Sequence, residues 1–297
     1  MPPPIIEDTP DQLKALAIAD TLEKGGPGVW PFIDPKDLAV SLKARIRIPT
    51  KIDQSTTPNC APAAMAYDLA HNKPALYAET IAGLYRSGFA FLPGIGFDGD
   101  RLVASDRLRN VDYNTIYGVR TPDKQPAADW ILLSSIRNSE SWGNIYWGSG
   151  FPLGWASGTT LPSTFEKWLH GFGYTRTVNK TNLVFTKDLS DLTEASDLLD
   201  KGWRVFLFIN AKVLKKRTQS DRSLTPDHYV PLMSRVTIES YPNTGMALSQ
   251  DAVFPSEYVR FVCTSWGKSQ RVPEDHYLPL TVAGFCRNFY GYVAAIN

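Results

Sequence analysis

The stretch Gln54–Ala64 constrains this chain most, because it places a single thiol at the expected start of a helix. Pro58 and Asn59 are residue types of turns and helix N-caps, and the alanine-rich run that follows carries apolar side chains at helical spacing. Pro62 fits a helix only near its first turn. The backbone N–H groups and the positive dipole end at a helix start favour a thiolate over a thiol. Cys60 is therefore a candidate nucleophile.

Gln54 precedes Cys60 by six residues, and its side-chain amide is a candidate donor beside the Cys60 N–H. Two donors aimed at one point next to a sulfur nucleophile form an oxyanion hole, which stabilises the charge that develops on an attacked carbonyl. A lone cysteine at the start of an alanine-rich helix is also compatible with a small buried hydrophobic side chain. Both interpretations are open on this stretch alone.

The second half of the chain contains a histidine at the start of one apolar segment and a Trp-Gly pair at the end of another. Trp203–Asn210 predicts a buried strand, Asp227-His228 stands at the head of the next, and Tyr258–Gly267 predicts a strand that ends in Trp-Gly. An imidazole beside a thiol takes its proton and later protonates a leaving amine. A third polar group then fixes the orientation of the ring.

The order of these motifs resembles that of the papain-like cysteine peptidases. In that family a glutamine precedes a cysteine that opens a helix of small residues, an Asp-His or Asn-His pair follows, and Asn-Ser-Trp-Gly comes later. The run Cys60-Ala-Pro-Ala-Ala64 is most similar to bacterial members in which Cys-Gly-Pro-Ala is common, with Ala61 in place of the usual glycine. The resemblance spans about Lys51 to the C-terminus and leaves Ser87–Gly158 as an unmatched insertion.

The resemblance implies roles for three residues. Cys60 is the nucleophile, His228 is the general base and acid, and Gln54 is an oxyanion donor. The implied activity is hydrolysis of a peptide or amide bond through a thioester on Cys60, with no cofactor and no metal.

The group that orients His228 is left open, because Thr264 stands where the family has asparagine. The candidates are Thr264, Ser265, Asp227 and a distant carboxylate, and a further alternative is that the orienting group is missing. Trp266 is expected to shield the pair from water.

The implied fold is of the α+β class and papain-like, with a helical lobe that carries the Cys60 helix and an antiparallel β-sheet lobe that carries His228. The expected boundaries are an N-terminal arm with one short helix at 1–35, a catalytic domain at 36–297, a mainly helical lobe at 36–200 with an aromatic and glycine-rich insertion at 87–158, and a β-rich lobe at 201–297. The loops of the insertion are expected to form a groove wall or to fill a core.

Hydrophobic periodicity predicts the local elements. Helices are expected at Asp11–Leu22, Ala75–Tyr85, Ala127–Arg137, Thr160–Gly173 and Leu192–Leu199, and a strand at Asp37–Pro49. The helix at Thr160–Gly173 begins with a capping pattern, and His170 is expected to cap its end. Cys263 and Cys286 are expected to be buried structural thiols, and His276 to be solvated.

Composition excludes several classes of function. The formal net charge is +1 and the longest basic run is Lys215-Lys-Arg217, which predicts no nucleic-acid partner. The three cysteines form neither a disulfide framework nor a zinc pattern, which is typical of a reducing compartment. No apolar run approaches the ~20 residues of a membrane span, and the first residues lack a secretory signal. We therefore expect cytoplasmic synthesis and, if the protein is exported, a route without a cleaved signal peptide.

The resemblance also suggests a biological role for the hydrolase, and two alternatives to peptide cleavage stay open. The bacterial character of the cysteine motif resembles that of effectors or toxins delivered into other cells, for example by type VI secretion, which implies a cognate immunity or inhibitor protein beside the protein or peptide substrate. The same thiol and imidazole also serve a peptidoglycan amidase, a deamidase or a transglutaminase-like enzyme. A catalytically degenerate fold that only binds a partner is the second alternative.

Overall fold

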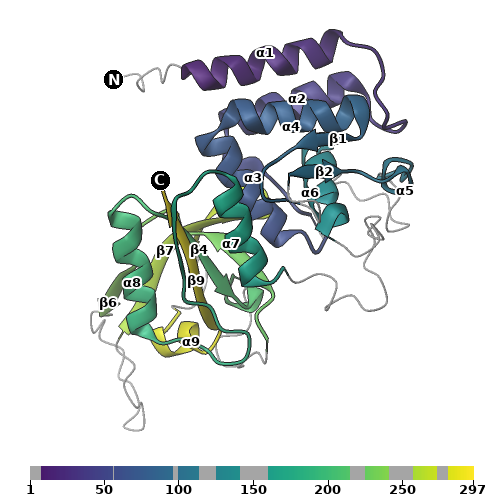
Figure 1. Ribbon diagram of the computed structural model, residues 1–297. Coiled ribbons are helices and arrows are strands. Elements are labelled where there is room, and N and C mark those ends of the chain that lie inside the picture. The colour runs from purple at the N-terminus through teal and green to yellow at the C-terminus, as the bar shows by residue number, and fades with distance from the viewer. Residues whose placement is uncertain are drawn as a thin grey trace, which may run out of the picture. The chain divides into compact units, whose positions relative to one another are not determined.

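The computed structural model describes residues 8–55, 57–95, 100–113, 125–140, 160–214, 225–240, 257–272 and 280–297. Over these ranges the chain is of the α+β class and its three sheets are antiparallel. The chain divides into two compact units, Met1–Gly158 with Trp266–Lys268 and Thr159–Ser265 with Ser269–Asn297. Figure 1 shows the elements of both.

The first unit is mainly helical. Its elements are α1 (Pro10–Lys24), α2 (Pro35–Arg47), η1 (Pro49–Lys51), α3 (Cys60–Asn72), α4 (Pro74–Ser87), β1 (Phe89–Phe91), β2 (Arg101–Val103), α5 (Asp106–Arg109) and α6 (Ala127–Glu140). The helices predicted at Asp11–Leu22, Ala75–Tyr85 and Ala127–Arg137 are confirmed as α1, α4 and α6. Helix α1 lies along α2 and α4 (Figure 1), so the N-terminal arm packs as part of this unit.

The strand predicted at Asp37–Pro49 is wrong, because this segment forms helix α2. The carboxylate of Asp34 caps the first turn and Pro35 is the first helical residue, a strong N-terminal signal. Apolar side chains one turn apart form a fully buried face: Leu38, Leu42 and Ile46. The apolar and basic alternation that suggested a strand covers only Ala44–Ile48, and the longer helical pattern outweighs it.

The second unit combines two sheets with flanking helices. Its elements are α7 (Pro162–Gly171), β3 (Arg176–Asn179), α8 (Leu189–Asp200), β4 (Arg204–Ile209), η3 (Ala211–Leu214), β5 (His228–Pro231), β6 (Thr237–Ser240), β7 (Glu257–Ser265), β8 (Lys268–Val272), α9 (Val282–Cys286) and β9 (Phe289–Ile296). One sheet has the order β3-β9-β4-β5 and the other β6-β7-β8. A bridge from Leu232 to Cys263 continues the pairing from the end of β5 to β7.

Strand β4 is buried on both faces, as its continuous apolar run predicts. One face joins the side chains of α8, β7 and α9 in a single core, to which β4 contributes Val205, Leu207 and Ile209. The other face packs into a group of aromatic rings. Phe165 meets Phe206 edge-on with 5.0 Å between centroids, and Tyr229 stacks on Phe165 at 4.7 Å and on Phe208 at 4.4 Å. Helix α7, which supplies Phe165, therefore covers the face opposite to α8.

The units divide at residues 158 and 159, whereas the sequence favoured a division between 200 and 201. Helices α7 and α8 are where the sequence predicted helices, but they belong with the sheets. The expected side-chain cap of α7 is wrong, because its N-cap is Leu161 and no side chain accepts a hydrogen bond there. The aromatic residues at 142–148 of the insertion lie outside the described residues.

Candidate active site

Cys60 is the first residue of α3, and its side chain is buried. Asn59 is the N-cap residue, and its carbonyl accepts the first helical hydrogen bond from the Ala63 N–H at 2.8 Å. Pro62 lies in the first turn, where its missing N–H breaks no hydrogen bond. The thiol thus lies at the positive end of the dipole of a 13-residue helix.

Gln54 lies in the loop that leads from η1 to Cys60, defined here as the Cys60 loop (residues 52–55 and 57–59). Its side chain is buried, and its Nε2 lies 3.5 Å from the Thr57 carbonyl oxygen. The Thr57 hydroxyl donates in return to the Gln54 carbonyl at 2.5 Å. These contacts fold the loop back on itself between Gln54 and the start of α3. The predicted role of Gln54 as an oxyanion donor stays a prediction.

A buried ion pair holds the start of the Cys60 loop. The Nε of Arg45 lies 3.1 and 3.0 Å from the two carboxylate oxygens of Asp129, and its Nη2 lies 2.9 Å from Oδ2. The same Nη2 donates to the Lys51 carbonyl at 3.0 Å, and Asp129 accepts the Asp53 N–H at 3.0 Å. Burial raises the pKa of Asp129 to about 6, while the Arg45 guanidinium and the Asp53 N–H oppose that rise.

Two further side chains hold the Cys60 loop. Gln125 donates to the Asp53 carbonyl at 3.1 Å, and Nη2 of Arg137 donates to the Pro58 carbonyl at 2.9 Å. Sequence reasoning missed these residues together with Arg45 and Asp129. The signal for Asp129 was present, because it is the only charged residue in the apolar segment 127–136, and a charge on a buried helix face needs a partner.

His228 opens β5 and is buried, as predicted for a histidine at the head of a strand. Its Nε2 lies 2.7 Å from the hydroxyl oxygen of Ser265, the last residue of β7. Because β5 and β7 run antiparallel, the beginning of one lies beside the end of the other. The Nε2 of the imidazole is thereby held by a hydroxyl group.

Alternation along β7 separates the two adjacent hydroxyl residues. Ser265 shares its face with Cys263, which belongs to the core that Val230 of β5 also joins. Thr264 therefore lies on the opposite face of the strand from Ser265. The carboxylate of Asp227 accepts the Ala211 N–H at 2.7 Å at the start of η3. Ser265, one of the orienting groups considered, contacts the ring through its hydroxyl.

Trp266 and Gly267 form the two-residue connection between β7 and β8. Both have left-handed backbone, with φ of 48° and 72°, as a type I′ hairpin turn requires. The Gly267 N–H donates to the Ile52 carbonyl at 3.1 Å, which ties this turn to the Cys60 loop. Across the described ranges, the non-glycine residues with left-handed backbone are Trp266 and Ser55 of that loop. Such strain is often found at functional sites.

The other thiols and histidines differ from Cys60 and His228. Cys263 is fully buried, as expected, and burial raises its pKa to about 12. Cys286 was also expected to be buried but is partly exposed, and burial together with Asp188 and Asp191 raises its pKa to about 11. His170 binds locally, to the Tyr174 carbonyl at 3.2 Å and the Thr177 hydroxyl at 3.0 Å. The predicted His276 lies outside the described residues.

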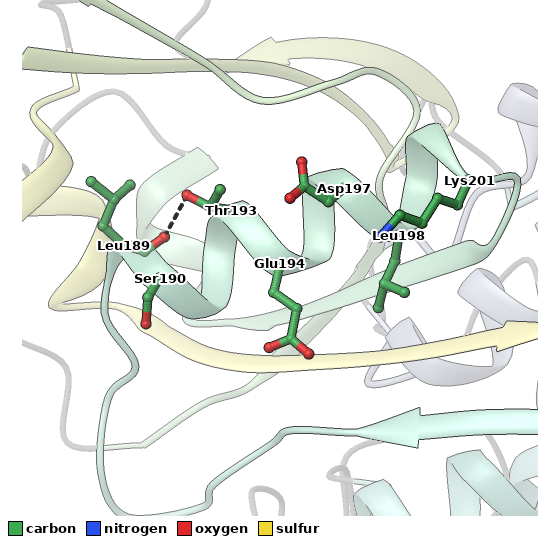
Figure 2. Close-up of a pocket in the computed structure, with 7 residues that line it drawn as sticks. All are labelled: Leu189, Ser190, Thr193, Glu194, Asp197, Leu198 and Lys201. Carbon is green, nitrogen blue, oxygen red and sulfur yellow. Dashed lines mark hydrogen bonds between the residues drawn. The ribbon is translucent and has the colours of Figure 1, made fainter.

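A hollow of about 620 Å³ lies elsewhere, along α8. Figure 2 shows its lining residues, Leu189, Ser190, Thr193, Glu194, Asp197, Leu198 and Lys201. The Thr193 hydroxyl donates to the Leu189 carbonyl at 2.9 Å, and Glu194 pairs with Lys180 at 3.3 Å. These polar groups are engaged in local contacts, and no predicted site residue lines the hollow.

In the parts of the chain that the structure describes, no group of His, Cys, Asp and Glu side chains is arranged to hold a metal ion. No helix in those same parts has the length and apolar character of a membrane span.

The predicted site residues thus fall into two groups. Gln54, Cys60 and Trp266 belong to the first unit, and Asp227, His228, Thr264 and Ser265 belong to the second. The structure brings His228 and Ser265 together, and the pairing of His228 with Cys60 stays a prediction. Comparisons with protein-family models, with curated proteins and with solved structures found no match to this chain.

Proposed function

We propose that this chain is a cysteine hydrolase that cleaves a peptide or amide bond through a thioester on Cys60, with His228 as general base and acid. The observation that carries the proposal is the 2.7 Å contact between His228 Nε2 and Ser265 Oγ. A catalytic histidine needs a fixed ring orientation, and a hydroxyl that binds Nε2 of a buried imidazole supports that requirement.

The chain's connectivity also supports the proposal. Ser265 is followed directly by Trp266 and Gly267, and the Gly267 N–H binds the Ile52 carbonyl, two residues before Gln54. One short stretch of backbone therefore links the residue that holds His228 to the loop that leads to Cys60. In its order of elements, a helix that begins with the cysteine and a later sheet that carries the histidine, the chain is consistent with the papain-like two-lobe architecture that we propose for it.

The chemistry proceeds in two stages. With Nε2–H donating to Ser265, Nδ1 carries the lone pair and takes the proton of the Cys60 thiol. The thiolate attacks the substrate carbonyl carbon, and the resulting oxyanion accepts hydrogen bonds from the Gln54 amide and the Cys60 N–H. The C–N bond breaks as the imidazolium gives its proton to the leaving amine, which leaves the acyl group on sulfur.

Hydrolysis of the thioester completes the cycle. Nδ1 of His228 takes a proton from a water molecule, whose oxygen attacks the acyl carbon, and the same oxyanion donors stabilise the second tetrahedral intermediate. The C–S bond then breaks, the carboxylic acid leaves, and the sulfur regains its proton from the imidazolium. No step in this cycle requires a cofactor or a metal.

The test is the rate of iodoacetamide alkylation of Cys60 between pH 6 and 9, followed by peptide mapping, in wild type and His228→Ala. We expect fast alkylation of Cys60 well below pH 8.5, the ordinary thiol pKa, and loss of that reactivity in His228→Ala. Hydrolysis of a peptide library should disappear in Cys60→Ala. A Cys60 that reacts slowly and is indifferent to His228 would refute the proposal and favour a binding protein.

A further inference from the structure

The Cys60 loop has little regular structure of its own. Its internal backbone hydrogen bond is the one from the Thr57 N–H to the Gln54 carbonyl at 3.1 Å, and the Ser55 N–H is held by the Asp53 carboxylate at 2.7 Å. At its two ends the loop is also held by side chains of α2, of α6 and of the segment just before α6, and by the Gly267 N–H, which binds the Ile52 carbonyl. The position of the loop therefore depends on those side chains.

Those side chains are all buried, with exposures of 7% for Arg45, 1% for Asp129, 8% for Gln125 and 6% for Arg137. They bind the residue just before the loop through the Lys51 carbonyl, its beginning through both backbone polar groups of Asp53, and its end through the Pro58 carbonyl. Both sides of the Gln54 position are fixed in this way. The last contact lies two residues before the thiol.

A buried ion pair is a poor source of net stability, because the cost of removing two charges from water offsets most of their attraction. Its best attested role is to select one arrangement among alternatives. Arg45 contacts Asp129 of α6 and the Lys51 carbonyl with the same guanidinium, so it fixes the loop relative to both helices. That geometry is the one expected of a positioning device.

We propose that Arg45, Asp129, Gln125 and Arg137 are positioning residues that hold Gln54 and Cys60 in the arrangement required for thiol chemistry. The inference rests on the proposed function and adds to it a set of residues from outside the predicted site. They do not touch the substrate. They act through the backbone of the Cys60 loop, where a displacement of about 1 Å is sufficient to lower a rate by about 100-fold.

The test compares Gln125→Met, Asp129→Asn and Arg137→Met with the control Ser135→Ala. Ser135 lies on the same helix as Asp129 and Arg137 and is fully buried, but its hydroxyl donates to the Ile131 carbonyl and not to the loop. Three quantities are measured for each variant: the melting temperature, hydrogen exchange in peptides covering residues 51–60, and the pH dependence of Cys60 alkylation, together with kcat and KM where hydrolysis is detected.

We expect faster exchange in residues 51–60 for the three loop variants, a loss of about tenfold or more in Cys60 alkylation at pH 6.5, and a fall in kcat larger than the change in KM. Ser135→Ala should match wild type in all of these. Arg137→Lys, which retains a donor, should recover part of the loss. Gln125→Met removes one hydrogen bond and leaves no buried charge unpaired, so we expect it to fold. It can therefore decide the test even if Asp129→Asn does not fold.

The two proposals fail in different ways. If the loop variants fold, and their hydrogen exchange in residues 51–60 and their Cys60 alkylation match those of wild type, the positioning role is overturned. This holds whether or not wild-type Cys60 proves reactive. If wild-type Cys60 titrates as an ordinary thiol, the proposed function fails, and exchange in residues 51–60 still decides whether these side chains hold the loop.

Discussion

The face of β7 on which a hydroxyl side chain lies determines whether that hydroxyl can contact His228. Ser265 and Thr264 are neighbours in sequence, and the sequence alone left both open as the group that orients His228. The contact at 2.7 Å belongs to Ser265, because its side chain alternates with that of Thr264 across β7. The roles of these two hydroxyl groups can therefore be separated by mutation.

We predict that Ser265→Ala lowers kcat by about tenfold or more, the equivalent of losing one hydrogen bond of ~1.4 kcal/mol. Thr264→Val, which removes the hydroxyl from the other face, should lower kcat much less. Steady-state kinetics and the melting temperature of both variants check this prediction. Equal losses in the two variants, or a larger loss in Thr264→Val, would contradict the assignment of Ser265.

Cys286 gives an internal reference for the reactivity of Cys60. Burial and the carboxylates of Asp188 and Asp191 raise its pKa to about 11, so the neutral thiol predominates near pH 7. Only the thiolate reacts. As long as the pH is below the pKa, the thiolate fraction rises about tenfold for each unit by which the pH increases. We predict that alkylation of Cys286 rises about tenfold per unit between pH 7 and 9.

In the same samples, alkylation of Cys60 should change little over that range, because the proposed thiolate is already formed. Mass spectrometry of the separated peptides measures both rates. Parallel slopes for the two cysteines would show that Cys60 is an ordinary thiol.

At the scale of elements, the turn between β7 and β8 is the clearest constraint. Gly267 has φ of 72°, and a Cβ added there would lie 3.1 Å from the Asp53 Cβ. Gly202, after α8, has φ of 83° with nothing within 4 Å of the same position. Both glycines thus have left-handed backbone, but only Gly267 also lies close to the Cys60 loop.

We predict that Gly267→Ala and Gly202→Ala each destabilise the chain by about 1–2 kcal/mol, the cost of left-handed backbone for a residue with a Cβ. Only Gly267→Ala should also slow Cys60 alkylation, because it displaces Asp53. Chemical denaturation and thiol labelling measure the two effects. The interpretation fails if Gly202→Ala slows labelling equally.

Much of this element structure could be predicted from the sequence, because it depends on local patterns. Helix α3 follows from a turn, a first-turn proline and alanine-rich periodicity, and β4 from a continuous apolar run. Helix α2 was missed because a short alternation was preferred over the cap at Asp34. The ion pair that holds the start of the Cys60 loop could not be predicted from local patterns. Arg45 and Asp129 are 84 residues apart in sequence, and the packing of α2 on α6 brings them together.

At the scale of the whole molecule, each unit has a core of its own. Asp129 is buried in the first unit beside Arg45, and Phe206 is buried in the second against Phe165. Removing one partner of a buried ion pair typically costs 3–5 kcal/mol, and replacing a core phenylalanine with alanine costs a similar amount.

We predict that Asp129→Ala lowers the unfolding free energy of the first unit by about 3–5 kcal/mol and Phe206→Ala that of the second by a similar amount. Hydrogen exchange of peptides from α1 and from β9 reports the units separately in each variant. Equal changes in both sets of peptides would mean that the chain unfolds as one cooperative system.

The first unit is discontinuous, because residues 266–268 return to it after the chain has built most of the second unit. During synthesis at about 5–20 residues per second, the roughly 110 residues between 158 and 267 take roughly 5–20 s to make. Through that interval the Ile52 carbonyl has no Gly267 N–H to bind. A nascent chain on the ribosome therefore carries Cys60 before the loop beside it can form the hydrogen bond from Gly267.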